Sequence, residues 1–241
     1  MVRDLRQRCP WDRAQTRETL RPYLVEEVLE LDDALGGGDP DTIRGEVSDL
    51  LLHLAFQLVI AEERREFSAD EVAEHLDRKM RRRHPQLFDL GEAEPWERIK
   101  RRERRGKTLS GIVPTLPPLL KAYRLQERAA SVGFDWPDVE GPLQKVREEL
   151  GEVELEVASG ANDRLRDEIG DLLFAVVNLA RKAEVQPGPA LDRANRKFSA
   201  RFEAVEALCA QRGIDLDSAG LEVLDRLWGE VKRQESVKSE R

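Results

Sequence analysis

Acidic residues recur at helical spacing in two parts of this chain. The second part contains Glu148, Glu149 and Glu152 in "EELGE", followed by Glu168 and Asp171 in "EIGD". Residues three or four positions apart lie on the same face of a helix. Folding the chain at the intervening polar turn "SGAND" would therefore bring the two acidic groups together.

Carboxylates that converge in this way repel one another unless a cation lies between them. Two like charges about 4 Å apart repel by about 4 kcal/mol at the effective dielectric constant of a protein surface. All-oxygen ligands suit Mg²⁺ or Mn²⁺ better than zinc, and neither acidic group contains cysteine. Because Mg²⁺ held by a few carboxylates is usually shared with substrate phosphates, the pattern favours a polyphosphate substrate.

Basic and aromatic residues that could hold such a substrate also occur in the second half: Lys145, Lys197, Arg201, Lys232 and Trp228. Each has a simpler explanation. Lys145 would pair with the glutamates one turn further along its helix, Lys197 and Arg201 would line a solvated face, and Trp228 would belong to the core.

The first half repeats the acidic spacing, so the chain is a tandem duplication. Each of its residues Glu27, Glu30, Glu46 and Asp49 lies 122 positions before its counterpart. In a chain with 37% charged residues a single "EExxE" is more often a solvated helix face, and a duplication retained only for packing remains an alternative. Spacing retained in two copies favours the metal-binding interpretation. The first half therefore offers a second metal site.

The two halves differ beside these acids. Tyr23 stands where the second half has Lys145, which weakens the expected grip of the first half on a triphosphate. His53 follows Asp49 by four residues, where the second half has Ala175. We expect His53 to be a core or capping residue rather than a metal ligand.

The elements that must position these residues are helices. Strand signals are weak, whereas apolar residues recur every three or four positions, so we predict an all-α fold. Asp39-Pro40 and Ser68 are predicted helix starts. A segment rich in proline and glycine separates the halves, which predicts an N-terminal domain at 1–105, a linker at 106–118 and a C-terminal domain at 119–241.

Each half also contains a helix that is apolar nearly all round, "DLLLHLAFQLVIA" or "DLLFAVVNLA". Such a helix needs neighbours on all sides, which a two-helix hairpin alone does not supply. We therefore expect the halves, or two chains, to pack together as a bundle.

Composition excludes several classes of protein. The chain has 241 residues and a net charge of −8, which argues against nonspecific binding to nucleic acid. Its two cysteines lie too far apart for a CxxC metal site, and no segment reads as a signal peptide or a transmembrane helix. We expect a cytoplasmic protein.

The ordered motifs resemble the MazG family of nucleoside triphosphate pyrophosphohydrolases. They include "CPWDRAQT", "LVEEVLEL", "RGEVSDLLLHL", "VGFDW", "DEIGDLLFAVVNLAR", "ANRKFSARF" and "LWGEVKRQE". The resemblance implies tandem helical hairpins that form four-helix bundles, commonly across a homodimer. It also implies Mg²⁺, for which Mn²⁺ can substitute, and hydrolysis of a nucleoside triphosphate to monophosphate and pyrophosphate.

Site residues follow from the same resemblance, which credits catalysis to the C-terminal domain. The residues that would hold Mg²⁺ are Glu149, Glu152, Glu168 and Asp171. Those that would contact the nucleotide are Lys145, Glu148, Arg164, Leu165, Arg166, Asp167, Lys197, Arg201, Trp228 and Lys232. Glu148 is our choice for the general base that activates water.

Two alternatives remain open at this point. One is a pyrophosphatase restricted to dUTP or to modified nucleotides. The other is a noncatalytic helical scaffold that binds nucleic acid or protein, which the basic runs "RKMRRRH" and "RIKRRERRGK" suggest.

Overall fold

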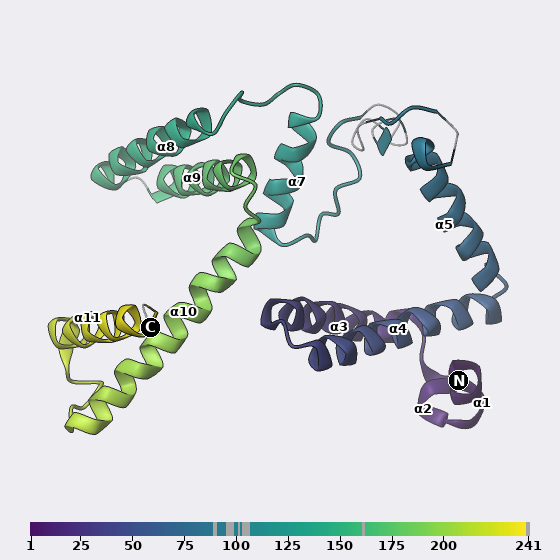
Figure 1. The fold of residues 1–241 in the computed structure, drawn as a ribbon, viewed down its shortest axis with the longest axis horizontal. Helices are drawn as coiled ribbons and strands as arrows, with labels where there is room; N and C mark the ends of the chain where they lie inside the picture. The colour runs from purple at the N-terminus through teal and green to yellow at the C-terminus, as the bar shows by residue number, and fades with distance from the viewer. Residues whose placement is uncertain (89–90, 95–98, 101, 103–106, 161, 240–241) are drawn as a thin grey trace. The chain divides into compact units, whose positions relative to one another are not determined.

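A computed structural model describes residues 1–88, 91–94, 99–100, 102, 107–160 and 162–239, with side chains described to residue 235. Within these ranges the chain forms α-helices and one short 3₁₀ helix, without a strand, which confirms the predicted all-α class (Figure 1). The chain divides into two compact units, Met1–Lys100 and Arg101–Arg241, which are described separately.

The first unit is built around one long helical hairpin. Its elements are α1 (Val2–Arg8), α2 (Pro10–Ala14), α3 (Arg17–Gly37), α4 (Pro40–Glu63), α5 (Ala69–Arg83) and η1 (Pro85–Leu87). The side chain of Asp39 accepts a hydrogen bond from the backbone N–H of Thr42 at the start of α4. Ser68 and Glu71 form a reciprocal capping box at the start of α5. Both predicted helix starts are therefore confirmed.

Helix α1 packs against the C-terminal part of α4 and closes a small core. The buried residues of this core are Val2, Leu20, Phe56 and Ile60. Two ion pairs hold the same junction, since Arg3 Nη2 lies 2.6 Å from Glu62 and Arg6 Nη2 lies 2.7 Å from Glu63. The first turns of the chain thereby fix the end of α4.

The second unit contains two helical hairpins and one preceding helix. Its elements are α7 (Pro118–Ala130), α8 (Glu140–Ser159), α9 (Asn162–Lys182), α10 (Pro187–Arg212) and α11 (Gly220–Ser239). Helices α8 and α9 pack along their length, α7 packs against α9, and α10 pairs with α11 (Figure 1). Gly160 ends α8 with a φ of 71°, a left-handed conformation that favours glycine.

The predicted linker, residues 106–118, falls within the residues of the second unit. Residue 106 lies outside the described residues, as does Trp96, which belongs to the repeat of "WERIK" and "WGEVK". The last linker residue, Pro118, is the first residue of α7. Two linker residues between these ends, Leu109 and Ser110, accept hydrogen bonds from Arg128 of α7 through their backbone oxygens.

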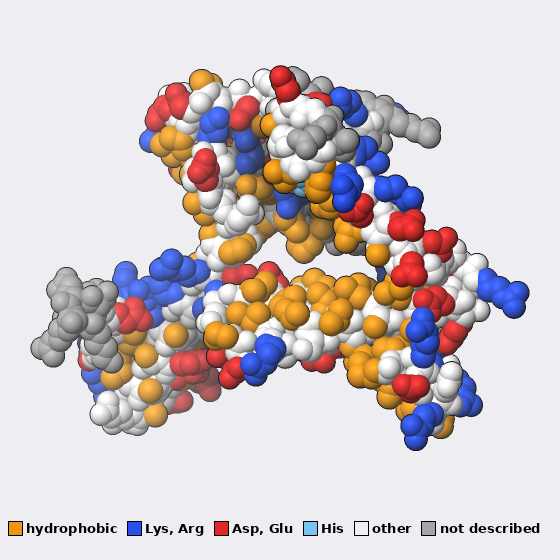
Figure 2. Space-filling model, turned by 45° about the vertical axis from the view of Figure 1, so that its right-hand side comes forward, with side chains coloured by type: hydrophobic (Ala, Val, Ile, Leu, Met, Phe, Trp, Pro, Cys, Tyr) orange, Lys and Arg blue, Asp and Glu red, His pale blue; other side chains and the backbone are white. Residues whose placement is uncertain are grey.

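The hairpins α3–α4 and α8–α9 both leave apolar side chains exposed. Leu51 of α4 is 64% exposed and Leu155 of α8 is 70% exposed. Figure 2 shows hydrophobic side chains gathered along the hairpin of α3 and α4. The tandem helical hairpins are as predicted, and their exposed faces have room for further helices.

Among the helices within the described ranges, none combines the length and the apolar composition that crossing a membrane requires.

Candidate active site

The hairpin of α8 and α9 brings together acidic residues from both helices. Carboxylate oxygens of Glu149, Glu168 and Asp171 all lie within 4.8 Å of one another. Oxygens of Glu148, Glu149 and Glu152 form a second group with the same property. The acids of "EELGE" and "EIGD" therefore converge across the turn, as predicted. Glu149 belongs to both of the spatial groups.

Glu149 is the buried centre of this cluster. Its exposed fraction is 5%, and its Oε2 atom is buried without a hydrogen-bond partner among the described residues. A buried carboxylate oxygen without a donor is unfavourable, so the site calls for a positive ligand. The all-oxygen donor set therefore suits a hard cation such as Mg²⁺.

Lys145 supplies the positive charge nearest to this cluster. Its Nζ lies 2.6 Å from Glu148 Oε1 and 2.7 Å from Glu149 Oε1, and these hydrogen bonds raise the pKa of Lys145. The surroundings of Glu152, by contrast, disfavour its charged form. Burial, the proximity of Glu149 and the negative charges of Glu149 and Glu168 raise its pKa. The cluster thus holds more negative charge than Lys145 compensates.

The first turn of α9 carries the segment predicted to contact the nucleotide. Arg164 lies 3.3 Å from Glu156 of α8, and Arg166 lies 3.7 Å from Asp163. Leu165 is half-buried and Asp167 is exposed. This segment lies at the turn of the hairpin, immediately before Glu168.

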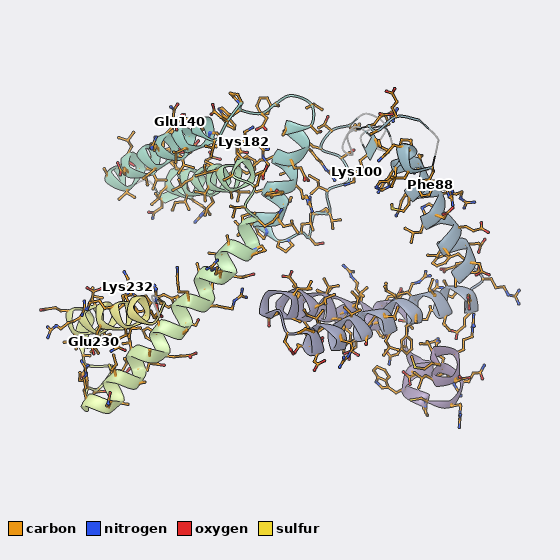
Figure 3. The ribbon with its side chains drawn as sticks, in the orientation of Figure 1. Phe88, Lys100, Glu140, Lys182, Glu230 and Lys232 are labelled. Carbon is orange, nitrogen blue, oxygen red and sulfur yellow. The ribbon has the colours of Figure 1, made fainter. Side chains whose placement is uncertain are left out.

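The other predicted nucleotide contacts lie on the hairpin of α10 and α11. Arg201 pairs with Glu235 at 2.7 Å, and its guanidinium lies 5.9 Å from the centre of the Trp228 ring. Trp228 also packs against the core of this hairpin, while Lys197 is exposed. Lys232 projects from α11 (Figure 3). The structure brings Arg201 and Trp228 together, and all four residues lie on a different hairpin from the carboxylates.

The first unit contains an acidic cluster at the equivalent positions of its hairpin, but with fewer acids. Oxygens of Glu27, Glu30 and Glu46 lie within 4.8 Å of one another, whereas Asp49 is exposed and is not in this group. His53 Nε2 lies 3.7 Å from Glu27 Oε1, and its Nδ1 is buried without a described partner. Burial and the surrounding carboxylates raise the pKa of Glu30.

One pocket of the second unit was not anticipated from the sequence. It lies between three elements: helix α7, helix α9 and the loop that precedes α8. Gln126 and Asn178 are among the residues that line it. Both amides are more than nine-tenths buried. Asn178 interrupts the apolar run "FAVVNLA", which was the available signal in the sequence.

Comparisons with known proteins agree with this architecture. The family model of the MazG nucleotide pyrophosphohydrolase domain matches residues 15–88 and 139–206, and each segment contains one acidic hairpin. A nucleoside triphosphate pyrophosphohydrolase of Escherichia coli K12 is 40% identical, over 97% of this chain and 94% of its own length. The nucleoside triphosphate pyrophosphohydrolase/pyrophosphatase MazG of Thermotoga maritima is 41% identical, over 93% and 89%. Uncharacterized protein YabN of Bacillus subtilis is 38% identical, over 98% of this chain and 51% of its own length.

Proposed function

Because this chain belongs to the MazG nucleotide pyrophosphohydrolase family, we propose that its α8–α9 hairpin hydrolyses nucleoside triphosphates to monophosphate and pyrophosphate in the presence of Mg²⁺. The family and the enzyme class predicted from the sequence are confirmed by these relatives. The metal, the breadth of substrates and the residue roles are the parts that we propose.

The unpaired oxygen of Glu149 carries this proposal. Among the described residues, Oε1 of Glu149 has Lys145 as its partner, whereas the buried Oε2 has none, which is unfavourable without a cation. Glu149, Glu152, Glu168 and Asp171 would hold Mg²⁺, and Mn²⁺ would serve in its place. When bound, the ion lowers the pKa of water and offsets charge on the phosphates.

The remaining chemistry needs a base and a positively charged grip on the substrate. Water attacks the α-phosphorus, the bond from the α-phosphorus to the bridging oxygen breaks, and pyrophosphate leaves. Glu148 is 58% exposed at its side chain and is oriented by Lys145, so it would accept the proton of the water. Protonated Lys145 lies beside it and would contact the departing phosphates.

The predicted nucleotide contacts divide between two hairpins. The segment Arg164, Leu165, Arg166 and Asp167 lies at the turn that precedes Glu168. Lys197, Arg201 and Lys232 would bind phosphate oxygens, and Trp228 would contact the sugar. A second copy of the chain would cover the exposed apolar faces of the α8–α9 hairpin and complete a four-helix bundle, so we propose a homodimer.

Product analysis tests the proposed reaction directly. The full chain is incubated with Mg²⁺ and each common nucleoside triphosphate, and the monophosphate, pyrophosphate and orthophosphate are quantified. We expect equal amounts of monophosphate and pyrophosphate from all of them, and loss of both products with a chelator. Recovery with Mg²⁺ or Mn²⁺ is the matching control. Release of orthophosphate alone, or no release from any triphosphate, would contradict the proposal.

The range of substrates distinguishes broad specificity from its alternative. Turnover of dUTP or a modified triphosphate alone would show a restricted pyrophosphatase. Comparable turnover of all the common triphosphates is the result that we expect.

A further inference from the structure

A cavity of about 290 Å³ lies within the second unit, lined by residues of α7, of α9 and of the loop that precedes α8. Three aromatic side chains line it, Phe134 and Trp136 from the loop before α8 and Phe174 from α9. The volume is just below the usual range of about 300–1,000 Å³ for small-molecule pockets, which suits one flat ring system rather than a whole ligand. Neither the proposed metal ligands nor the predicted phosphate contacts belong to this lining.

Two buried amides give the cavity polar groups. Gln126 is 6% exposed, and its Nε2 donates to the backbone oxygen of Phe174 at 2.8 Å, while its Oε1 is buried without a partner among the described residues. Asn178 is 8% exposed, and its Oδ1 accepts hydrogen bonds from Arg181 at 2.8 and 3.0 Å. One amide thus retains an acceptor and the other a donor group, the pair of functions with which amides read the edge of a base.

The walls of the cavity are held in place by contacts outside it. Arg181 pairs with Asp135, which fixes the loop that carries Phe134 and Trp136. Arg128 donates a hydrogen bond of 2.6 Å to the backbone oxygen of Ser110, next to the cavity-lining residue Leu109. A pre-formed pocket binds a ligand without the entropic cost of ordering its walls.

The cavity continues the row of proposed catalytic residues along the hairpin. Asp171, Phe174 and Asn178 follow one another at spacings of three and four on α9, so they share a face. Asn178 is about 10 Å further along the helix than Asp171. On α8, a methyl group added at Gly141 would overlap the ring of Trp136, and Lys145 follows one turn later.

Figure 3 labels Glu140 and Lys182 at the end of this hairpin that lies away from its turn. Lys182 donates a hydrogen bond to the backbone oxygen of Trp136. The cavity is therefore near the open end of the hairpin, whereas Glu168 is near the turn. This separation matches a nucleotide whose sugar lies between the α-phosphate and the base.

We propose that this cavity receives the base of the nucleoside triphosphate and that Gln126 and Asn178 hydrogen-bond to its edge. The inference rests on the proposed function of the neighbouring carboxylates. All four common bases place an N–H donor next to an acceptor, so the pocket accepts them all. It discriminates against bases that lack the donor, because Gln126 Oε1 would then remain unpaired. Trp228 is left to contact the sugar.

Pairing altered bases with an altered pocket tests this proposal. ATP is compared with purine riboside triphosphate, which lacks the exocyclic amine, and UTP is compared with its N3-methyl derivative. We expect the wild-type kcat/KM to be about tenfold lower for each altered base, as for loss of one hydrogen bond to a buried group. Gln126→Leu should lose about tenfold with ATP and UTP and little more with the altered bases.

A second variant guards against misfolding of Gln126→Leu, whose Nε2 also supports Phe174. Phe134 is 82% exposed, so Phe134→Ala should retain the thermal stability and raise KM for every triphosphate. Leu221→Ala is the matched control, because Leu221 of α11 is 84% exposed and lies outside the cavity.

The possible outcomes separate this inference from the proposed function. If the wild-type enzyme uses altered and unaltered bases equally, or if Phe134→Ala behaves as Leu221→Ala does, the base pocket is wrong although pyrophosphate release stands. If the wild-type chain releases no pyrophosphate from any triphosphate, the proposed function itself fails.

Discussion

The hairpins α3–α4 and α8–α9 carry the same acidic spacing in different surroundings. Glu149 is buried and pairs with Lys145, and its other oxygen has no partner in the described part of the chain. Its counterpart Glu27 retains 20% exposure at its side chain and lies beside His53. At the position equivalent to Lys145, Tyr23 is 45% exposed. The neighbours of the acids, and not their spacing, therefore distinguish the two clusters.

This difference indicates how a duplicated site can diverge while its helices stay alike. In both hairpins burial and then the neighbouring carboxylates raise the pKa of one glutamate, Glu30 in the first and Glu152 in the second. The second has a lysine within hydrogen-bond distance of its central acid and an aromatic cavity further along the same hairpin, whereas the described residues of the first place no lysine beside Glu27. We therefore expect substrate turnover to depend on the second hairpin.

The largest expected effect comes from removing the charge of one central acid. Glu149→Gln should lower pyrophosphate release by at least about a hundredfold, because a metal ion contributes several kcal/mol of transition-state stabilisation. Glu27→Gln is its matched partner in the first hairpin and should retain most of the activity. Circular dichroism should show unchanged helix content in both variants. Equal losses in the two variants would show that the hairpins act together.

Lys145 provides the next test of the comparison. Lys145→Met should raise KM for nucleoside triphosphates about tenfold, as expected for the loss of one charge-assisted hydrogen bond to phosphate. Tyr23→Met changes the equivalent exposed position and should leave KM unaltered. Steady-state kinetics across a range of triphosphate concentrations measures both. An unchanged KM in Lys145→Met would mean that Lys145 only neutralises Glu148 and Glu149.

The smallest expected effect is on the free energy of unfolding and concerns the ion pairs at the end of each hairpin. Burial raises the pKa of Asp135, but hydrogen bonds from Arg181 and Lys182 outweigh it and hold this pKa below its usual value. The stabilisation is therefore complete above the unfolded-state pKa of about 3.9 and is lost as the pH falls through the folded-state value. Asp135→Asn should cost about 1 kcal/mol near pH 7 and progressively less below pH 4.

The first hairpin supplies the comparison for this measurement. There the acid lies on the long helix and the base on the segment packed against it. Arg3 of α1 pairs with Glu62 at the end of α4 and lowers the pKa of Glu62. Arg3 is 69% exposed at its side chain, so Glu62→Gln should change the free energy of unfolding less than Asp135→Asn does. Denaturant unfolding at several pH values measures both variants. A larger effect for Glu62→Gln would contradict this order.

Local signals in the sequence were sufficient for the helices and for the convergence of the acids. Capping residues such as Asp39 and Ser68 act within one turn, and the spacing of Glu149, Glu168 and Asp171 around a short turn determines that they meet. The structural setting of Trp228 needed more information. Its packing against Phe198 depends on how two helices meet, although the sequence did leave a core position open.

The base pocket illustrates what the sequence could not provide. Gln126 reaches Phe174 across 48 positions, and that contact requires α7 to pack on α9. Periodicity identifies each helix but does not fix which faces meet, so the amide pair was not foreseen. The homodimer remains a prediction for the same reason, since the partner of an apolar face is not encoded in its periodicity.

The contacts of Arg128 have a practical consequence for dividing this protein. Leu109 and Ser110 precede the predicted C-terminal domain at 119–241, yet Arg128 binds both backbones and Leu109 lines the cavity. A fragment that begins at residue 119 would leave Arg128 without these acceptors and open one side of the pocket. A fragment of the second half should therefore include Leu109 and Ser110, and its nucleotide selectivity would be the sensitive indicator of a cut made too late.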